Sequence, residues 1–252
     1  MARNERSLEM TVDIHTGASI LRSIATPHAG ASSASSVTTT RLTRALLACG
    51  LVAGPLYVVV GGIQALTRPG FDLRRHDLSL LSNGPLGWIQ ITNLMVSGLL
   101  VVACAVGIRR TMRGSHGGTW GPLLLGVYGV GLIGAGFFIA DPAYGFPPGT
   151  PADAHTISGH GLLHVASGGI GFLALIAACL VFARRFAAVG QQGWAAYSVV
   201  TGVLFFAAFV GIASGSGNSW TILGFWMGVI LAWAWVAAMA VRLIAGRPGA
   251  KS

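Results

Sequence analysis

The chain has 252 residues, of which 53% are hydrophobic and only 9% are charged, and its formal net charge is +9. Soluble domains carry about 25% charged residues, so this composition argues against a soluble protein and favours one embedded in lipid. The positive charge does not indicate nucleic-acid binding, because the 16 Lys and Arg residues cluster at the ends of apolar stretches and leave no basic soluble surface.

The N-terminal segment, residues 1–40, is rich in Ser, Thr and Ala and shows no sustained hydrophobic period. We expect a disordered cytoplasmic tail here, and a second, short cytoplasmic tail at residues 247–252. A secretory signal would need an apolar region before its cleavage site, whereas the first long apolar stretch begins only near Leu42.

Between the two tails, residues 41–246 contain six apolar stretches of roughly 20 residues, the length that crosses a bilayer as a helix. No alternating pattern indicates a β-barrel. The sequence therefore predicts an all-α fold, a single integral membrane bundle of six transmembrane helices. The stretches are Leu42–Leu66, Trp88–Ile108, Gly121–Ala140, His160–Phe182, Trp194–Ala213 and Trp220–Leu243.

The cations are divided unevenly between the two sides of this bundle. Thirteen fall on the side of the termini and three on the other, so the positive-inside rule predicts a cell-membrane protein with both termini cytoplasmic. The outer side holds Arg68, Arg74 and Arg75. It also holds every acidic residue beyond the N-terminal tail, namely Asp72, Asp77, Asp141 and Asp153.

The first outer connection combines polar groups that could form a site. Two guanidinium groups could hold a phosphate or carboxylate of a lipid, or simply contact headgroups. An imidazole and a carboxylate could bind a metal or transfer protons, and two hydroxyls could act as nucleophiles beside a base. These residues are Arg74, Arg75, His76, Asp77, Ser79 and Ser82.

The same connection is too apolar to be freely solvated, because Leu78, Leu80 and Leu81 lie between its polar residues. We expect it to lie on the bundle or in the membrane interface.

The third apolar stretch is rich in glycine, which predicts a helix that packs closely on more than one side. Its glycines are Gly126, Gly129, Gly131, Gly134 and Gly136. The three cysteines, Cys49, Cys104 and Cys179, fall inside apolar stretches without metal-binding spacing, so we expect buried thiols.

The second outer connection, Asp141–His164, holds two acidic residues and three His. His160 and His164 stand four residues apart and share one helical face, as in zinc helices, but the Glu of H-E-x-x-H is absent. Two interpretations follow, a hydrogen-bonded interfacial pair or a metal site. With zinc as the possible cofactor, the candidate ligands are His76, Asp141, His160 and His164.

We expect these outer groups to converge, because Asp141 closes the third stretch while His160 opens the fourth, so both lie at one depth. An unpaired Asp or His near hydrocarbon is costly, which should draw the groups together. The alternative is that each reaches water or headgroups separately.

Particular sequence boxes over about residues 45–243 resemble a prokaryotic membrane family, domain of unknown function 998. The resemblance implies a multi-helix integral membrane protein and no established activity. The boxes are His76-Asp77-Leu78-Ser79-x-Leu81-Ser82, Gly87-Trp88-x-Gln90-x-x-Asn93, Gly98–Arg109, Asp141-Pro142, Gly145-Phe146-Pro147-x-Gly149 and His160-Gly161-x-x-His164.

Two functional hypotheses follow. In the first, a polar His/Asp/Arg pocket at the extracytoplasmic face binds a lipid or small amphiphile. In the second, the same cluster serves a metal-assisted membrane hydrolase. The chain resembles hydrolases related to alkaline ceramidase in residue types only, and its residue order and helix count differ, so no catalytic role is transferred. The lipid bilayer is the one expected partner, and the sequence leaves the oligomeric state open.

Overall fold

The computed structural model of the chain describes residues 29–115, 117–154, 156–215 and 217–246. Within these ranges it contains six long α-helices and one short 3₁₀ helix, η1. The elements are α2 (Ala29–Thr67), η1 (Leu78–Ser82), α3 (Gly87–Thr111), α4 (Trp120–Phe137), α5 (Gly159–Ala188), α6 (Gln192–Ala213) and α7 (Ser219–Ala245).

Each long helix contains a segment that is long and apolar enough to cross a membrane, and the segment within α2 is Thr40–Thr67. The predicted all-α fold with six spans is therefore confirmed, and the chain is a multi-pass membrane protein. Of the segment predicted to be a tail, residues 29–40 form the first part of α2. Residues 1–28 and 247–252, which hold the rest of both predicted tails, lie outside the described residues.

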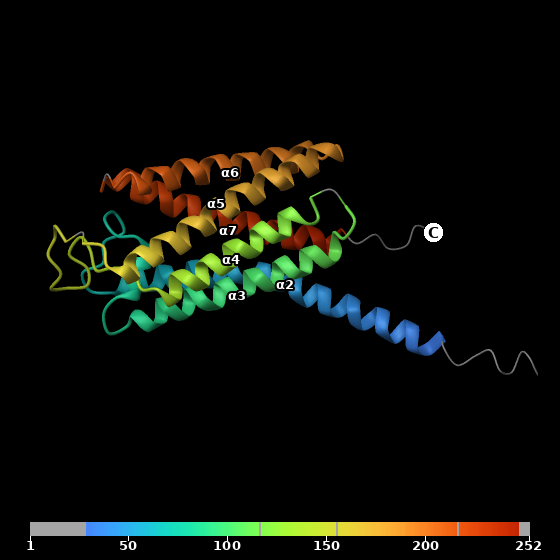
Figure 1. The fold of residues 1–252 in the computed structure, drawn as a ribbon, viewed down its shortest axis with the longest axis horizontal. Coiled ribbons are helices and arrows are strands. Elements are labelled where there is room, and N and C mark those ends of the chain that lie inside the picture. Colours follow the sequence, from blue (N-terminus) through green and yellow to red (C-terminus); the bar gives the residue numbers. More distant parts are fainter. Residues whose placement is uncertain (1–28, 116, 155, 216, 247–252) are drawn as a thin grey trace, which may run out of the picture. The chain divides into compact units, whose positions relative to one another are not determined.

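Residues from Thr43 onward form one compact unit. Within it, each of the helices α3 to α7 packs against its neighbour in the sequence, and α3 also contacts α7. The connections α2–α3, α4–α5 and α6–α7 lie at the same end of this unit, which we call the loop end (Figure 1). The polar stretches that the sequence analysis assigned to one membrane face are therefore neighbours in space.

Glycine sets the spacing between α3, α4 and α5. A Cβ atom added to Gly98 of α3 would lie 2.5 Å from the carbonyl oxygen of Gly129 in α4. On another side of α4, a Cβ atom at Gly131 would lie 2.7 Å from Cα of Gly171 in α5. Backbones this close leave no room for a side chain. The prediction that this glycine-rich helix packs tightly on more than one side is confirmed.

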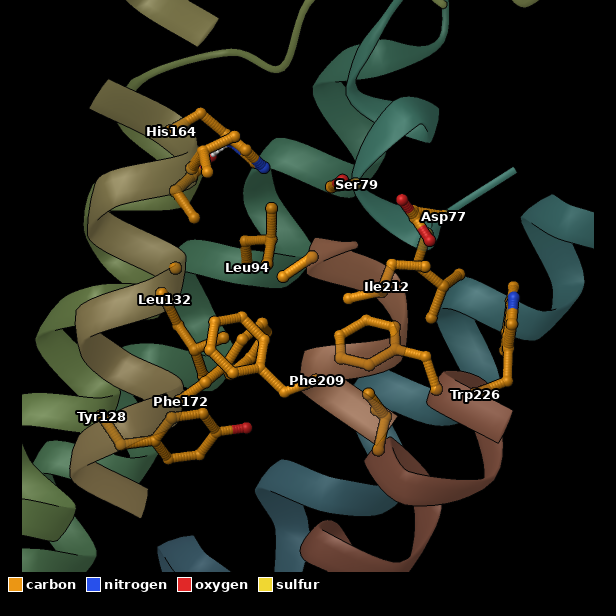
Figure 2. A pocket seen from close by; sticks show the side chains of 18 of the residues that line it. Asp77, Ser79, Leu94, Tyr128, Leu132, His164, Phe172, Phe209, Ile212 and Trp226 are labelled. Atoms are coloured by element: carbon orange, nitrogen blue, oxygen red, sulfur yellow. Dashed lines mark hydrogen bonds between the residues drawn. The ribbon is translucent and has the colours of Figure 1, made fainter. Parts of the chain in front are cut away.

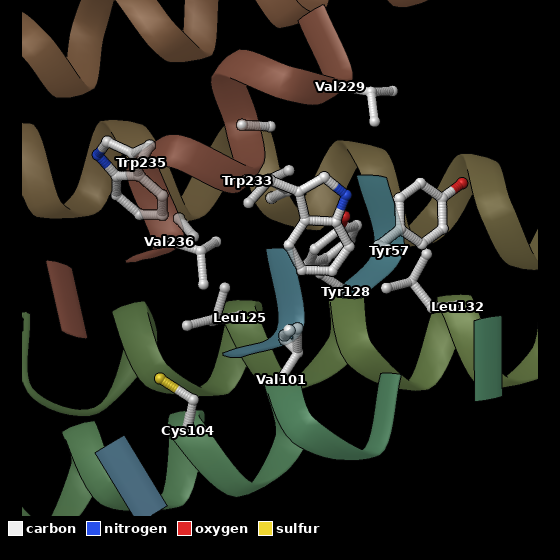
Figure 3. Packing of buried hydrophobic residues seen from close by; sticks show 14 of the residues in the cluster. Tyr57, Val101, Cys104, Leu125, Tyr128, Leu132, Val229, Trp233, Trp235 and Val236 are labelled. Carbon is white, nitrogen blue, oxygen red and sulfur yellow. The ribbon is translucent and has the colours of Figure 1, made fainter. Parts of the chain in front are cut away.

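Aromatic rings join the helices in the interior (Figure 3). The ring centroid of Trp233 in α7 lies 5.2 Å from that of Tyr57 in α2 and 5.7 Å from that of Tyr128 in α4. Trp235 is fully buried, and its indole N–H donates a hydrogen bond to Oγ of Ser198 over 3.0 Å. The rings of Tyr57, Tyr128 and Trp233 also form part of the wall of a cavity described below.

The substitution Gly98→Ala should destabilise the bundle, because the added methyl group must push α3 away from α4. We expect a loss of about 1–3 kcal/mol in the free energy of unfolding, the usual size of an overpacking effect. Gly126→Ala is the matched control, because its Cβ atom would make an ordinary contact of 3.8 Å with Ala105. Thermal unfolding in detergent measures both, and equal stability of the two variants would contradict the close approach.

Candidate functional site

At the loop end, Arg68 links the first connection, between α2 and α3, to the second connection, between α4 and α5. Its side chain is only 8% exposed, and it donates hydrogen bonds to the carbonyl oxygens of Leu81 (3.1 Å) and Asn83 (2.6 Å). Its guanidinium carbon lies 5.4 Å from the ring centroid of Phe146, within the range of a cation–π interaction. The amide of Asn83 donates in turn to the carbonyl of Ala140, 3.0 Å away. Arg68 therefore has a structural role, because two of its N–H groups donate to backbone carbonyls inside the protein.

His76 makes a second link between the two connections. Its Nδ1 accepts a hydrogen bond from the backbone N–H of Asp72 (2.8 Å), which assigns the ring proton to Nε2. Nε2 then donates to the carbonyl oxygen of Tyr144, 3.0 Å away. The ring is 3% exposed and lies beside the rings of Phe71 and Phe146. Both ring nitrogens are thus engaged by backbone groups.

Between these links, η1 rests on the bundle. Leu78, Leu80 and Leu81 are buried, as their apolar character predicted. Ser82 is also buried, and its hydroxyl donates to the carbonyl oxygen of Ser79 over 2.6 Å. The expectation that the first connection lies on the bundle is confirmed, and the Ser82 hydroxyl is used in holding the turn.

Asp141 is bound to the start of α5. One carboxylate oxygen accepts the backbone N–H of Ser158 (2.7 Å) and the other accepts its hydroxyl (2.6 Å). The same hydroxyl accepts the N–H of Gly161, so Ser158 is the N-cap of α5. A Cβ atom at Gly161 would collide with the Asp141 carboxylate. A negative group at a helix N-terminus is favourable, and this explains the role of Asp141 without a ligand.

His164 is buried one turn further along α5. Its Nδ1 lies 2.8 Å from the carbonyl oxygens of both Ala135 and Phe138, at the end of α4. A carbonyl can only accept, so Nδ1 carries the proton and Nε2 keeps its lone pair in the neutral ring. The contact fixes the ring and leaves one acceptor nitrogen free of these bonds.

The remaining predicted groups face outward. Arg74, Arg75 and His160 are exposed, and the ring of His160 lies 5.8 Å from that of Phe138. In the part of the chain that the structure describes, no three His, Cys, Asp or Glu side chains gather as a metal site requires. Zinc at His76, Asp141, His160 and His164 stays a prediction.

A cavity of about 280 Å³ opens beneath η1, between helices from both halves of the chain. Three of the predicted site residues line it: Asp77, Ser79 and His164. The rest of its wall is mainly aromatic and aliphatic, with Phe172 and Phe209 among the largest side chains (Figure 2). The structure therefore brings an imidazole, a hydroxyl and a carboxyl to one apolar cavity, while the predicted guanidinium groups of the first connection are absent from its lining.

Among the predicted site residues that the structure describes, Asp77 is the one with a buried side-chain atom that has no hydrogen-bond partner. Its side chain as a whole is half-buried, but its Oδ1 atom is fully buried and has no hydrogen-bond partner among the described residues. It precedes η1 without making a side-chain cap. Burial raises the pKa of this carboxyl to about 6, because the charged form loses its hydration. Perturbed groups of this kind concentrate at functional sites.

Sequence reasoning missed the helical part of the cavity wall. Phe172, Phe209 and Trp226 lie within apolar stretches, where a cavity-lining ring has the same sequence pattern as a core ring. It also missed a buried amide cluster, in which Gln64 donates to Gln90 over 2.9 Å and Asn93 donates to Gln90 over 3.2 Å. The polar residues inside α3 were the available signal for that cluster.

The raised pKa of Asp77 predicts a pH-dependent stability. The folded protein holds the Asp77 proton more tightly than the unfolded chain, in which the pKa of this carboxyl has its ordinary value of 3.8. The tighter binding of this proton stabilises the folded state. That stabilisation is full below about pH 4 and is lost as the pH rises through about 6. Asp77→Asn, neutral at every pH, should therefore melt above the wild type at about pH 8, and the difference should shrink on acidification.

The titratable residues Tyr57, Tyr128 and His164 line the same cavity and are retained in both proteins, so the comparison isolates Asp77. Asp153→Asn, which removes an exposed carboxylate, is the control. The measurement is thermal unfolding in detergent across this pH range. A melting difference between Asp77→Asn and the wild type that does not change with pH would contradict the desolvated carboxyl.

A model of the family described as Protein of unknown function (DUF998) matches residues 51–242, which run from α2 into α7. No curated protein and no solved structure matches the chain. The match includes Asp77, Ser79 and His164, and it confirms the resemblance seen in the sequence boxes. The chain belongs to the DUF998 family, whose description assigns no activity.

Proposed function

We propose that this protein binds a small single-chain amphiphile, with the polar head at Asp77, Ser79 and His164 and the tail among the aromatic side chains. The observation that carries the proposal is the cavity itself, which is mainly apolar and has these three polar residues in its lining. Ligand sites in proteins have this composition, mostly apolar walls with a few placed polar groups.

The polar groups must supply most of the selectivity for such a ligand. Inside a bilayer, lipid tails are as apolar as leucine, so transferring an alkyl tail into the cavity yields little hydrophobic free energy. The carboxyl of Asp77, by contrast, has a buried oxygen that finds no hydrogen-bond partner among the described residues, so a ligand group that donates to it binds favourably. The head of the ligand is therefore what distinguishes it from the surrounding lipid.

The proposed orientation places both termini in the cytoplasm and the cavity near the extracytoplasmic face of the cell membrane. The distribution of cations supports it, with 13 on the side of the termini and three at the loop end. The amphiphile would then exchange with the outer leaflet.

This orientation predicts which positions a membrane-impermeant maleimide can reach in intact cells. Thr150→Cys, in the second connection of the loop end, should be labelled, whereas Ser115→Cys, between α3 and α4, should be labelled only after the cells are opened. The native Cys49, Cys104 and Cys179 lie within helices and provide the background control. Labelling of Ser115→Cys in intact cells, with Thr150→Cys protected, would invert the topology.

Filling the cavity should weaken binding. A Cβ atom at Gly168 meets no atom within 4 Å, so Gly168→Leu can place its side chain in the cavity that this residue lines. We expect binding to weaken by about tenfold or more, because the tail and the new side chain compete for one volume. Gly62→Leu is the matched control, since a Cβ atom there also meets nothing within 4 Å and the residue lies outside the cavity lining.

Calorimetry in phosphatidylcholine nanodiscs, with empty nanodiscs subtracted, measures this binding for decylamine, decanol and decanoate in turn. The wild type and Gly62→Leu should bind at least one of them saturably, at one molecule per protein. Absence of saturable binding, or equal binding by Gly168→Leu, would overturn the proposal.

A further inference from the structure

We propose that the head of the bound amphiphile is an ammonium group, which donates hydrogen bonds to the carboxylate of Asp77 and to Nε2 of His164. This inference rests on the proposed function and deepens it by naming the chemistry of the ligand head. It follows from the hydrogen-bonding character and the charge of the groups that the cavity presents.

The two strongest polar groups of the cavity are both acceptors. Oδ1 of Asp77 is buried without a partner among the described residues. The Nδ1–H of His164 is committed to the carbonyls of Ala135 and Phe138, so Nε2 can only accept while the ring is neutral. In Figure 2 the His164 ring points toward the side of the cavity that holds Ser79 and Asp77. A ligand head that donates hydrogen bonds matches this pair.

The charge of the cavity favours a cation over a neutral donor. Among the residues that the structure describes, none of those lining the cavity is Lys or Arg. Of the cations in the first connection, Arg68 donates to the carbonyls of Leu81 and Asn83, and Arg74 and Arg75 are exposed. A carboxylate in an apolar cavity without a counter-charge is costly, and an ammonium group supplies one. A carboxylate or phosphate head would instead be repelled by Asp77.

Donor groups in the lining do not change this balance. The indole N–H groups of Trp226 and Trp233 are buried without hydrogen-bond partners among the described residues. They are neutral, so they cannot replace a counter-charge for Asp77, and the ring of Trp233 packs against Tyr57 and Tyr128 in the interior. The desolvation that raises the Asp77 pKa to about 6 still leaves the carboxyl mainly ionised at neutral pH.

The test compares decylamine, decanol and decanoate, which share one tail length and differ in the head, by nanodisc calorimetry at about pH 7.5. For the wild type we expect decylamine to bind about tenfold more tightly than decanol or decanoate, the gain expected from a hydrogen bond to a charged group. Asp77→Asn should lose the preference and bind decylamine and decanol about equally. Asp153→Asn, which removes the same charge from an exposed position, should keep the preference.

A second arm uses the unaltered protein and so does not depend on the folding of a variant. At about pH 5 the carboxyl of Asp77 is mainly protonated and no longer supplies a counter-charge to an ammonium head, so the wild type should lose its preference while decanol binding persists. The hydroxyls of Tyr57 and Tyr128, which also line the cavity, stay neutral throughout.

The outcomes separate the two proposals. Cavity-dependent binding of decanol or decanoate without a preference for decylamine would overturn the ammonium head and leave amphiphile binding intact. A preference that survives in Asp77→Asn would also overturn it. Binding that is equal in the wild type and Gly168→Leu for all three probes would overturn both proposals.

Discussion

The loop end depends on one constraint. Where a helix ends near hydrocarbon, its last carbonyl oxygens lack hydrogen-bond partners within the helix. Water satisfies such groups in a soluble protein, but here side chains must reach back to them. Arg68 binds two carbonyls of the first connection, His76 binds one of the second, and His164 binds two at the end of α4. Because each bond ties one segment to another, the same contacts that satisfy the backbone also join the connections.

This constraint decides which polar residues remain available for a ligand. Residues of the same type, which the sequence alone does not distinguish, differ in whether their polar atoms are already hydrogen-bonded within the protein. Both nitrogens of His76 and both oxygens of Asp141 are used, whereas His164 keeps Nε2 and Asp77 keeps a buried oxygen. The cavity lies beside these last two residues. The polar atoms at this end that could bind a ligand are therefore those that the structural hydrogen bonds do not use.

The hydrophobic pattern predicted the six spans and the buried position of η1, because burial of Leu78, Leu80 and Leu81 depends on composition alone. The hydrophobic pattern could not predict which polar groups make structural hydrogen bonds and which line the cavity. Asp77 and Asp141 are both carboxylates beside an apolar stretch, and only the fold places Ser158 against one and an apolar wall against the other. Likewise, the partners of His164 are backbone carbonyls, which every residue carries and no sequence motif marks.

The collision between a side chain at position 161 and the Asp141 carboxylate makes these two positions complementary in size. The carboxylate occupies the space that a methyl group at 161 would need, and it does so while bound to Ser158. A larger residue at 161 thus requires a shorter one at 141. Such a residue at 141 would lose both hydrogen bonds to Ser158. Position 161 can therefore accept a side chain only if position 141, twenty residues earlier in the chain, changes with it.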